Sequence, residues 1–283
     1  MSKQASIPSK QKQKTDKIMP EIRDGQSIEL LKELHILTRE GKINQDSRRK
    51  LKQVYHLYNF IEPLLKEFPE NLTLVDHGAG KSYLGFIIYD LFFKEPIRGQ
   101  VFGIETRPEL VLKSQELQKK LAFQNMSFLH LSVAESITSA DLPEQVDIVT
   151  ALHACDTATD DAIRFALSKK AKHVVLVPCC QAEVASVLRL NKARQLIHPI
   201  TEVWRHPLHT REFGSHLTNV LRCLQLESHG YQVTVTELVG LEHSMKNELI
   251  IASKKEAPRQ RAADRLQSIL TELGLLELKQ RFQ

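Results

Sequence analysis

Short apolar runs and longer periodic stretches alternate along this chain. A short continuous apolar run indicates a buried strand, whereas apolar residues that recur every three or four positions indicate one face of a helix. Runs of the first kind fall at 72–76, 100–105, 126–131, 146–152 and 173–178. Helical patterns between these runs cover 83–93, 109–122 and 159–168. The alternation predicts a doubly wound α/β domain with a mostly parallel sheet.

The last part of the chain breaks this alternation. A helical pattern over 213–228 stops at Gly230, and two apolar runs follow at 231–239 and 247–253 with a Gly-containing loop between them. Two consecutive strands predict a hairpin, so one of them runs antiparallel to the other strands. We therefore expect seven strands with an antiparallel last strand. A final helix over 261–278 has one apolar face, which indicates packing on the domain.

The N-terminal part has its own pattern. Residues 1–24 are polar and basic without periodicity, which is typical of a mobile tail. Helical patterns follow over 27–39 and about 46–68, and order is expected to begin near Ile28. The predicted division is a disordered basic tail (1–24), a helical extension (25–70), the α/β domain (71–255) and a C-terminal helix packed on it (256–283).

Composition excludes two broad classes of protein. Hydrophobic residues make up 42% and charged residues 26% of the 283 residues, which is ordinary globular usage. No apolar run reaches the roughly 18–20 residues of a membrane helix, and the first residues lack the apolar core of a signal peptide. The four cysteines, two of them adjacent, do not form a disulfide framework. We expect a cytoplasmic protein with reduced thiols and no membrane contact, and the oligomeric state stays open.

The net charge of +5 is concentrated at the N-terminus. Residues 1–58 hold 13 lysines and arginines against 7 acidic residues, whereas the remainder holds 26 against 27. The densest basic cluster is Arg48, Arg49, Lys50 and Lys52. Such a cluster attracts phosphates by non-specific Coulomb steering, but it is also common on solvated helix faces. The charge pattern therefore permits nucleic-acid binding without requiring it.

A glycine-rich turn follows the first strand. Asp76-His77-Gly78-Ala79-Gly80-Lys81-Ser82 precedes a helix, the position where a doubly wound sheet binds a nucleotide-like ligand. A P-loop is excluded because its first glycine would fall on Val75. A dinucleotide fingerprint fails because its third glycine position is Tyr83. An acidic residue two positions before the first glycine instead fits a cofactor whose charged end is a cationic amino acid.

These residues resemble the first motif, [DE]-x-G-x-G, of the class I S-adenosylmethionine-dependent methyltransferases. The resemblance covers roughly 72–253 and implies a Rossmann-like fold with an antiparallel last strand. More narrowly, three segments are similar to a methyltransferase-like branch with G-A-G-K, L-H-x-C and C-C signatures: LVDHGAGKSYL, LHACD and PCC. Some relatives of that branch are linked to tRNA or rRNA modification.

The resemblance implies a cofactor site for S-adenosylmethionine at the ends of the first strands. It assigns the motif turn to cofactor contact, Glu105 at the end of the second strand to both ribose hydroxyls, and Glu135 after the third strand to the adenine. The predicted cofactor-binding residues are Asp76, Gly78, Ala79, Gly80, Lys81, Glu105, Glu135 and Leu152. Lys81 has a second interpretation, because a lone lysine at such a site also reaches substrate or balances local charge.

The loop after the fourth strand is the predicted catalytic loop. It contains His153 and Asp156, and this fold places substrate-facing residues there. His153 has an unperturbed pKa near ~6.5 that suits a general base at neutral pH. Asp156 has the alternative role of capping the following helix, as does Thr157. The histidine, in turn, has the alternative of a packed loop residue.

Cys179 and Cys180 close the fifth strand beside the same edge and complete the predicted catalytic set. Covalent catalysis by a thiolate is one hypothesis, although cytosine C5 methyltransferases carry their Pro-Cys after the fourth strand. A metal site is a second hypothesis, but no C-x-x-C or H-x-x-x-H pair anchors it, so no metal is expected. The third interpretation is that both cysteines are small buried hydrophobes.

One further segment is a candidate for substrate contact. WRHPLHTREFGSHLTN (204–219) is rich in histidine and arginine, and Arg205 or Arg211 could hold a phosphate or another acidic group there. A second candidate is the turn 243–247, which resembles the branch's H-x-x-K-N signature.

The sequence thus predicts methyl transfer from S-adenosylmethionine to a macromolecule, with RNA preferred and protein second. The alternative is a non-catalytic scaffold of the same fold that binds nucleic acid. The intact set Asp76, Gly78, Gly80 and Glu105 argues against the scaffold. The acceptor atom stays open, because this fold supports methylation of O, N, C and S alike.

Overall fold

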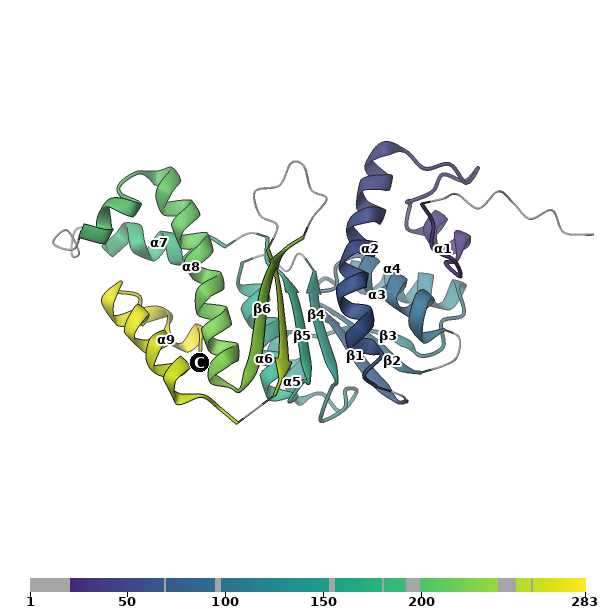
Figure 1. Ribbon diagram of the computed structural model, residues 1–283. Coiled ribbons are helices and arrows are strands. Elements are labelled where there is room, and N and C mark those ends of the chain that lie inside the picture. Colours follow the sequence, from purple (N-terminus) through teal and green to yellow (C-terminus); the bar gives the residue numbers. More distant parts are fainter. Residues whose placement is uncertain are drawn as a thin grey trace, which may run out of the picture.

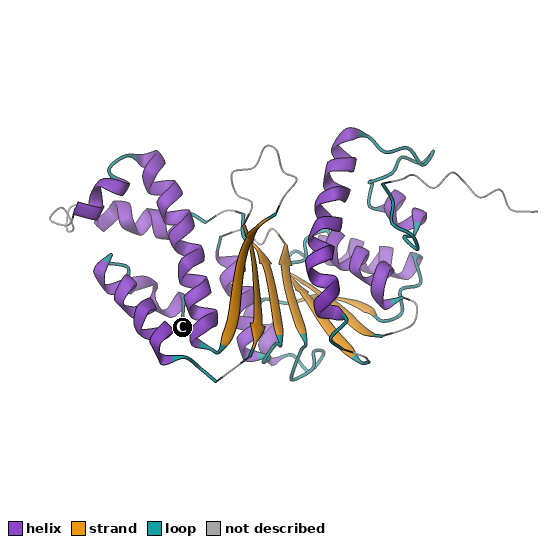
Figure 2. Cartoon of the chain, in the orientation of Figure 1, coloured by secondary structure: helices purple, strands orange, loops and turns teal. Residues whose placement is uncertain are grey.

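The computed structural model describes residues 21–68, 70–94, 98–152, 156–179, 181–191, 199–238, 248–255 and 257–283. Helices flank a single central sheet (Figure 1, Figure 2). Its seven strands are β1 (Leu72–His77), β2 (Gly99–Glu105), β3 (Met126–His130), β4 (Ile148–Leu152), β5 (His173–Val177), β6 (Tyr231–Glu237) and β7 (Glu248–Lys254).

The strand order confirms the predicted sheet. It is β3-β2-β1-β4-β5-β7-β6, with β1 to β5 parallel to one another. β7 pairs antiparallel with both β5 and β6, so the hairpin supplies the antiparallel last strand. The strands that follow β1 in the chain, β2 and β3, lie on one side of it, and β5 lies on the far side of β4. The loops at the carboxyl ends of β1 and β4 therefore meet at one edge of the sheet.

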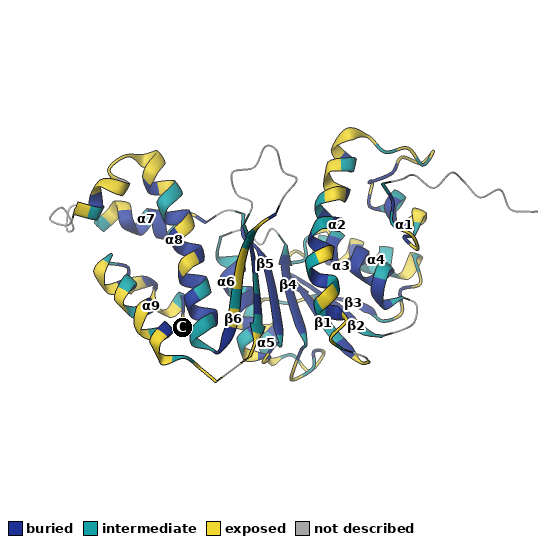
Figure 3. Ribbon diagram, in the orientation of Figure 1, coloured by how far each residue is buried: buried dark blue, intermediate teal, exposed yellow. Residues whose placement is uncertain are grey.

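Two hydrophobic clusters cover the two faces of the sheet. One joins the sheet to α2 (Gln45–Leu65), α3 (Tyr83–Ile88), the π-helical turn η1 (Tyr89–Phe93) and α4 (Pro108–Lys120). The other joins it chiefly to α6 (Thr157–Ser168), with α5 (Val133–Thr138) beside it. Strand residues alternate between the clusters: Leu74 belongs to the first and Val75 to the second. Figure 3 shows the central strands largely buried, with a single half-buried position in β1 and in β4.

A third cluster lies outside the sheet. It packs α7 (Glu183–Leu190), α8 (Pro207–Ser228), α9 (Gln260–Glu272) and the 3₁₀ turn η4 (Leu276–Arg281) on one another, with the 3₁₀ turn η3 (Pro199–Trp204) against α8. A Cβ added at Gly214 of α8 would lie 2.7 Å from the Ala185 backbone of α7. Only glycine therefore lets these two helices approach so closely.

The N-terminal extension packs on the domain rather than standing apart from it. α1 (Ile28–Glu33) is shorter than its pattern predicts because His35 takes a positive φ of 55° and turns the chain. Ile22 is 7% exposed and Arg23 lies 4.7 Å from the Tyr58 ring centroid, so packing begins before residue 28, within the stretch predicted as tail. Residues 1–20 of that tail lie outside the described residues.

Across the described ranges, every helix is too short or too polar to cross a bilayer.

Candidate cofactor and acceptor site

The glycine-rich loop sits at the carboxyl end of β1, between the central strands. Gly78 and Gly80 have φ values of 68° and 59°, which favour glycine. The Ala79 N–H donates to the Ile104 carbonyl at 2.9 Å, and the Ser82 N–H donates to the Ala79 carbonyl at 2.7 Å. The loop is therefore tight and attached to β2.

Glu105 at the end of β2 lies directly beside this loop. Its Oε2 accepts a hydrogen bond from the Gly80 N–H at 2.8 Å. Arg107 donates to the same carboxylate from Nε at 3.0 Å and from Nη2 at 3.1 Å. Burial alone would raise the pKa of Glu105, but the hydrogen bonds from Arg107 and Gly80 outweigh it and lower the pKa to about 2. A fixed, ionised acceptor thus stands at the loop.

The residues at this loop fit the cofactor that the motif implies. A carboxylate accepts hydrogen bonds from a pair of hydroxyl groups, as a ribose requires. A Cβ added at Gly80 would have the Arg107 guanidinium as its nearest atom, 3.7 Å away. The Arg107 side chain is 59% exposed. It covers the side of Glu105 that faces the loop, and it can turn away into solvent.

Asp76 supports the glycine-rich loop through buried hydrogen bonds. It is 2% exposed, and its Oδ1 accepts from Thr150 Oγ1 at 2.9 Å while its Oδ2 accepts from Ser82 Oγ at 3.3 Å. Burial raises the pKa of Asp76 to about 6, although both hydrogen bonds oppose the shift. The side chain joins β1, β4 and the start of α3. Asp76 thus supports the loop in this structure, and its predicted contact with the cofactor stays a prediction.

His77 is a residue that the sequence analysis did not single out. Its ring lies 5.3 Å from the Phe165 ring of α6, and it is 5% exposed. Neither ring nitrogen has a hydrogen-bond partner in the described part of the chain. Burial lowers the pKa of His77 to about 4, so the imidazole is neutral at pH 7. The alternation of side chains along β1 could have indicated this burial, because it places residues 76 and 77 on opposite faces of the sheet.

Of the predicted catalytic residues, the structure places Asp156 and Cys179. Asp156 starts α6 with a φ of 48°, and its side chain makes no cap hydrogen bond. Its Oδ1 instead accepts from the Ala182 N–H at 3.3 Å, which ties the β4 loop to the β5 loop. Cys179 follows β5 and is half-buried. His153 and Cys180 lie outside the described residues, as does the turn 243–247.

The other predicted contacts lie along the same edge. Leu152 ends β4 half-buried. Glu135 forms a capping box with Ser132 at the start of α5, where its Oε2 accepts from the Ser132 N–H at 2.7 Å. The hydrogen bonds from Ser132 lower the pKa of Glu135. Lys81 is exposed and lines a cavity of about 430 Å³ between α1, α3 and α4.

The predicted anion-binding arginines are ion-paired. Arg205 Nη1 lies 3.2 Å from Glu202, and Arg211 Nη2 lies 2.8 Å from Glu212. The rings of His206 and His209 meet edge to face, 5.5 Å apart. Within the described ranges, no three histidine, cysteine, aspartate or glutamate side chains converge as metal ligands would.

Comparison with known proteins identifies the domain that contains this site. Residues 49–187 match the model of a family described as a methyltransferase domain. The chain carries a methyltransferase domain. The match runs from α2 to α7, so the methyltransferase domain includes the glycine-rich loop, Glu105 and the carboxyl ends of β4 and β5. The enzyme family and the fold predicted from the first motif are thereby confirmed.

The curated relatives are distant and longer. The glutathione S-transferase C-terminal domain-containing protein of Bos taurus is 23% identical over 231 residues, which cover 75% of this chain and 34% of that protein. The Drosophila melanogaster homolog is also 23% identical over 231 residues, covering 72% and 36%. The chain thus spans about a third of the length of the curated relatives it matches.

Solved structures similar to this chain include several methyltransferases. A magnesium protoporphyrin IX methyltransferase from Synechocystis, with bound SAH, is 15% identical at a TM-score of 0.47, covering 80% of this chain and 94% of that one. An rRNA methylase from Streptococcus thermophilus is 9% identical at a TM-score of 0.44, covering 70% and 96%.

Proposed function

We propose that this methyltransferase domain transfers a methyl group from S-adenosylmethionine to a macromolecule. The observation that carries the proposal is the hydrogen bond from the Gly80 N–H to Glu105 Oε2, which fixes an ionised carboxylate at the glycine-rich loop. S-adenosylmethionine supplies an electrophilic methyl group, so the protein's task is alignment of cofactor and acceptor.

Each part of the edge has a role in that alignment. Glu105 would hold the ribose hydroxyls after Arg107 turns away, and the glycines of the loop, which have no side chains, would let the cofactor approach the backbone. Asp76 keeps the loop in place through Thr150 and Ser82. Asp156 keeps the β4 and β5 loops together through the Ala182 N–H. The proposed setting is the cytoplasm, in line with the free thiol of Cys223.

Glu105→Gln tests the cofactor site. The variant keeps the size of the side chain but loses the charge that holds Gly80 and would hold two hydroxyls. We expect the affinity for S-adenosylhomocysteine, measured by isothermal titration calorimetry, to fall by about tenfold or more. The matched control is Glu109→Gln in the first turn of α4, which should stay within about twofold of wild type. Equal affinities for both variants and wild type would reject the proposed site.

RNA is the first candidate acceptor, on the evidence of the N-terminal charge. Lys50 and Lys52 are exposed on α2, whereas Arg48 pairs with Glu21 and Arg49 with Asp46. Tritium transfer from labelled S-adenosylmethionine into RNA and protein extracts, with Glu105→Gln as the blank, identifies the acceptor. Counts sensitive to ribonuclease support RNA. Counts sensitive only to protease support the second candidate, a protein acceptor, which a separate feature of the structure favours.

A further inference from the structure

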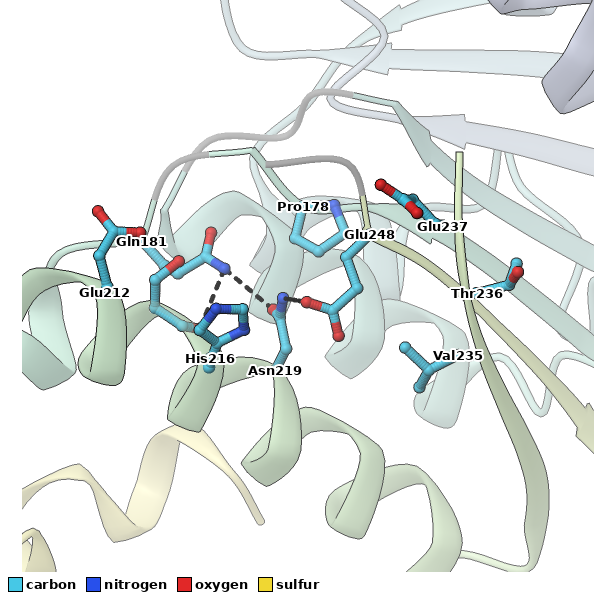
Figure 4. A pocket seen from close by; sticks show the side chains of 10 residues that line it. Pro178, Gln181, Glu212, His216, Asn219, Val235, Thr236, Glu237 and Glu248 are labelled. Carbon is cyan, nitrogen blue, oxygen red and sulfur yellow. Dashed lines mark hydrogen bonds between the residues drawn. The ribbon is translucent and has the colours of Figure 1, made fainter. Parts of the chain in front are cut away.

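A polar pocket lies at the carboxyl edge of the sheet, beyond β4. It has a volume of about 350 Å³ and lies between α8 and the adjoining ends of β5, β7 and β6 (Figure 4). Pro178, which follows β5 directly, forms part of its wall. Since β5 pairs with β4, the pocket stands one strand away from the end of β4, where the predicted catalytic loop begins.

The pocket is strongly acidic. Glu212, Glu237 and Glu248 line it, and no lysine or arginine stands among its described lining residues. Arg211, outside the lining, pairs with Glu212 at 2.8 Å. Glu237 and Glu248 have no such counter-ion in the described structure. They are also direct cross-strand partners in the β6–β7 ladder, an arrangement in which like charges destabilise a sheet. A bound cation would remove that repulsion.

The buried wall of the pocket also offers an unused hydrogen-bond acceptor. Gln181 is 5% exposed, and its Nε2 donates to the Ser215 carbonyl and to Asn219 Oδ1, each at 3.2 Å. Its Oε1 accepts no hydrogen bond in the described structure. Asn219 Nδ2 in turn donates to Glu248 Oε2 at 2.6 Å (Figure 4). Asn219 Oδ1 also accepts from Arg222 Nη1 at 3.1 Å, so in this pair of amides the Gln181 oxygen is the acceptor left without a hydrogen bond.

We propose that this pocket binds a cationic amine or guanidine group of a basic polypeptide, and that this polypeptide is the methyl acceptor. Such a group carries several N–H donors and a positive charge, which match the Gln181 oxygen and the carboxylates of Glu237 and Glu248. An RNA phosphate carries the same sign of charge as the wall and is repelled. The part of the inference that names the acceptor rests on the proposed function; the binding of the cationic group does not.

A binding experiment on the full chain tests the pocket without measuring methyl transfer. The probes are a short fluorescein-labelled peptide of alternating lysine and glycine, its counterpart with glutamate, and labelled oligouridine, each titrated by fluorescence anisotropy in the presence of S-adenosylhomocysteine. The variant is Glu237→Gln with Glu248→Gln. Glu237→Gln alone keeps the test valid if the double variant unfolds, because Glu237 is exposed. The matched control is the exposed Glu272→Gln on α9.

We expect the lysine peptide to bind wild type and to bind the double variant about tenfold or more weakly, with Glu272→Gln within about twofold. Equal peptide affinity in the double variant and the control would overturn the inference. It would also be overturned if wild type bound oligouridine more tightly than the lysine peptide and the double variant weakened that oligouridine binding. A parallel calorimetric titration with S-adenosylhomocysteine separates the two proposals. If that titration is flat while the peptide result holds, the proposed function fails and the cation pocket stands.

Discussion

At the end of β1, Asp76 and His77 are neighbours that the sheet sends to opposite faces. Each is nearly fully buried, and burial favours the neutral form of each side chain. It raises the pKa of Asp76 to about 6 and lowers the pKa of His77 to about 4. Glu105, at the end of the neighbouring strand, keeps its charge because the Arg107 guanidinium and three backbone N–H groups donate hydrogen bonds to it. Hydrogen-bond count, rather than residue type, therefore decides which carboxylate is the strong acid here.

Asp76→Asn should stabilise the fold at neutral pH. The amide keeps an acceptor for Thr150 and gains a donor for Ser82, while the buried charge disappears. The folded pKa of about 6 lies above the unfolded value near ~3.9, so wild type loses stability as the pH rises through that window. We expect a gain of about 1–3 kcal/mol that grows from about pH 4 to about pH 6 and is constant above.

Urea unfolding at a series of pH values measures this gain. The control is Asp24→Asn, an exposed position that should change stability by less than about 0.5 kcal/mol at every pH. A gain of equal size at pH 4 and pH 8 would show that packing, not ionisation, is responsible.

Among the helices, α8 connects the most parts of the molecule. Its Arg222 is 0% exposed and donates to both oxygens of Asp160 in α6, at 2.6 and 3.0 Å. Nη2 also donates to the Asp156 carbonyl at 2.8 Å, so this arginine holds the end of the β4–α6 connection, directly before α6. One face of α8 thus braces the predicted catalytic loop, and another lines the acidic pocket.

Arg222→Met should destabilise the protein by about 3–5 kcal/mol, because it leaves the Asp160 carboxylate buried without its partner. Adding Asp160→Leu should recover part of the loss, since an apolar pair of similar volume removes the stranded charge. Chemical denaturation of both variants measures the effect. Arg265→Met is the contrast: its pair with Glu227 is 58% exposed on the arginine side and should cost less than about 1 kcal/mol. Similar losses for Arg222→Met and Arg265→Met would contradict this account.

The whole molecule consists of a two-faced sheet with an added helical layer. The third cluster, formed by α7, α8, α9 and η4, shares α8 with the sheet but has its own apolar interior. Leu270, Leu275 and Phe282 are each at most 1% exposed in it. Because these side chains come from the last residues of the chain, the layer depends on the C-terminus.

Removing residues 257–283 should loosen α7 and α8 while the sheet stays folded. The truncation exposes apolar residues of α8, such as Leu221, that α9 and η4 cover. Amide hydrogen exchange should show faster exchange in α7 and α8 than in β1 and β4. Leu270→Ala is the milder test, with an expected loss of about 2–5 kcal/mol, and the half-exposed Leu276→Ala is its control. Uniform exchange changes across the sheet would show a single cooperative unit instead.

Local pattern was enough to predict most of the fold. Strands and helices are set by the spacing of apolar residues within one element, so the seven strands, the hairpin, the glycine-rich turn and Glu105 at a strand end were all predictable. The helices α5 and α7 were missed because segments of 6 and 8 residues are too short to display helical periodicity. Methyltransferase chemistry followed from one local motif.

What the tertiary structure alone decided are the partners of each polar side chain. Thr150 reaches Asp76 from 74 residues away, and Asp160 reaches Arg222 across 62. These contacts give Asp76 a supporting role besides its predicted cofactor contact, and they make Arg222 a link between two helices. The acidic pocket likewise gathers Gln181, Asn219 and Glu248 from three separate segments. No local pattern contains such pairings, because burial and charge at a site depend on which distant segments the fold brings together.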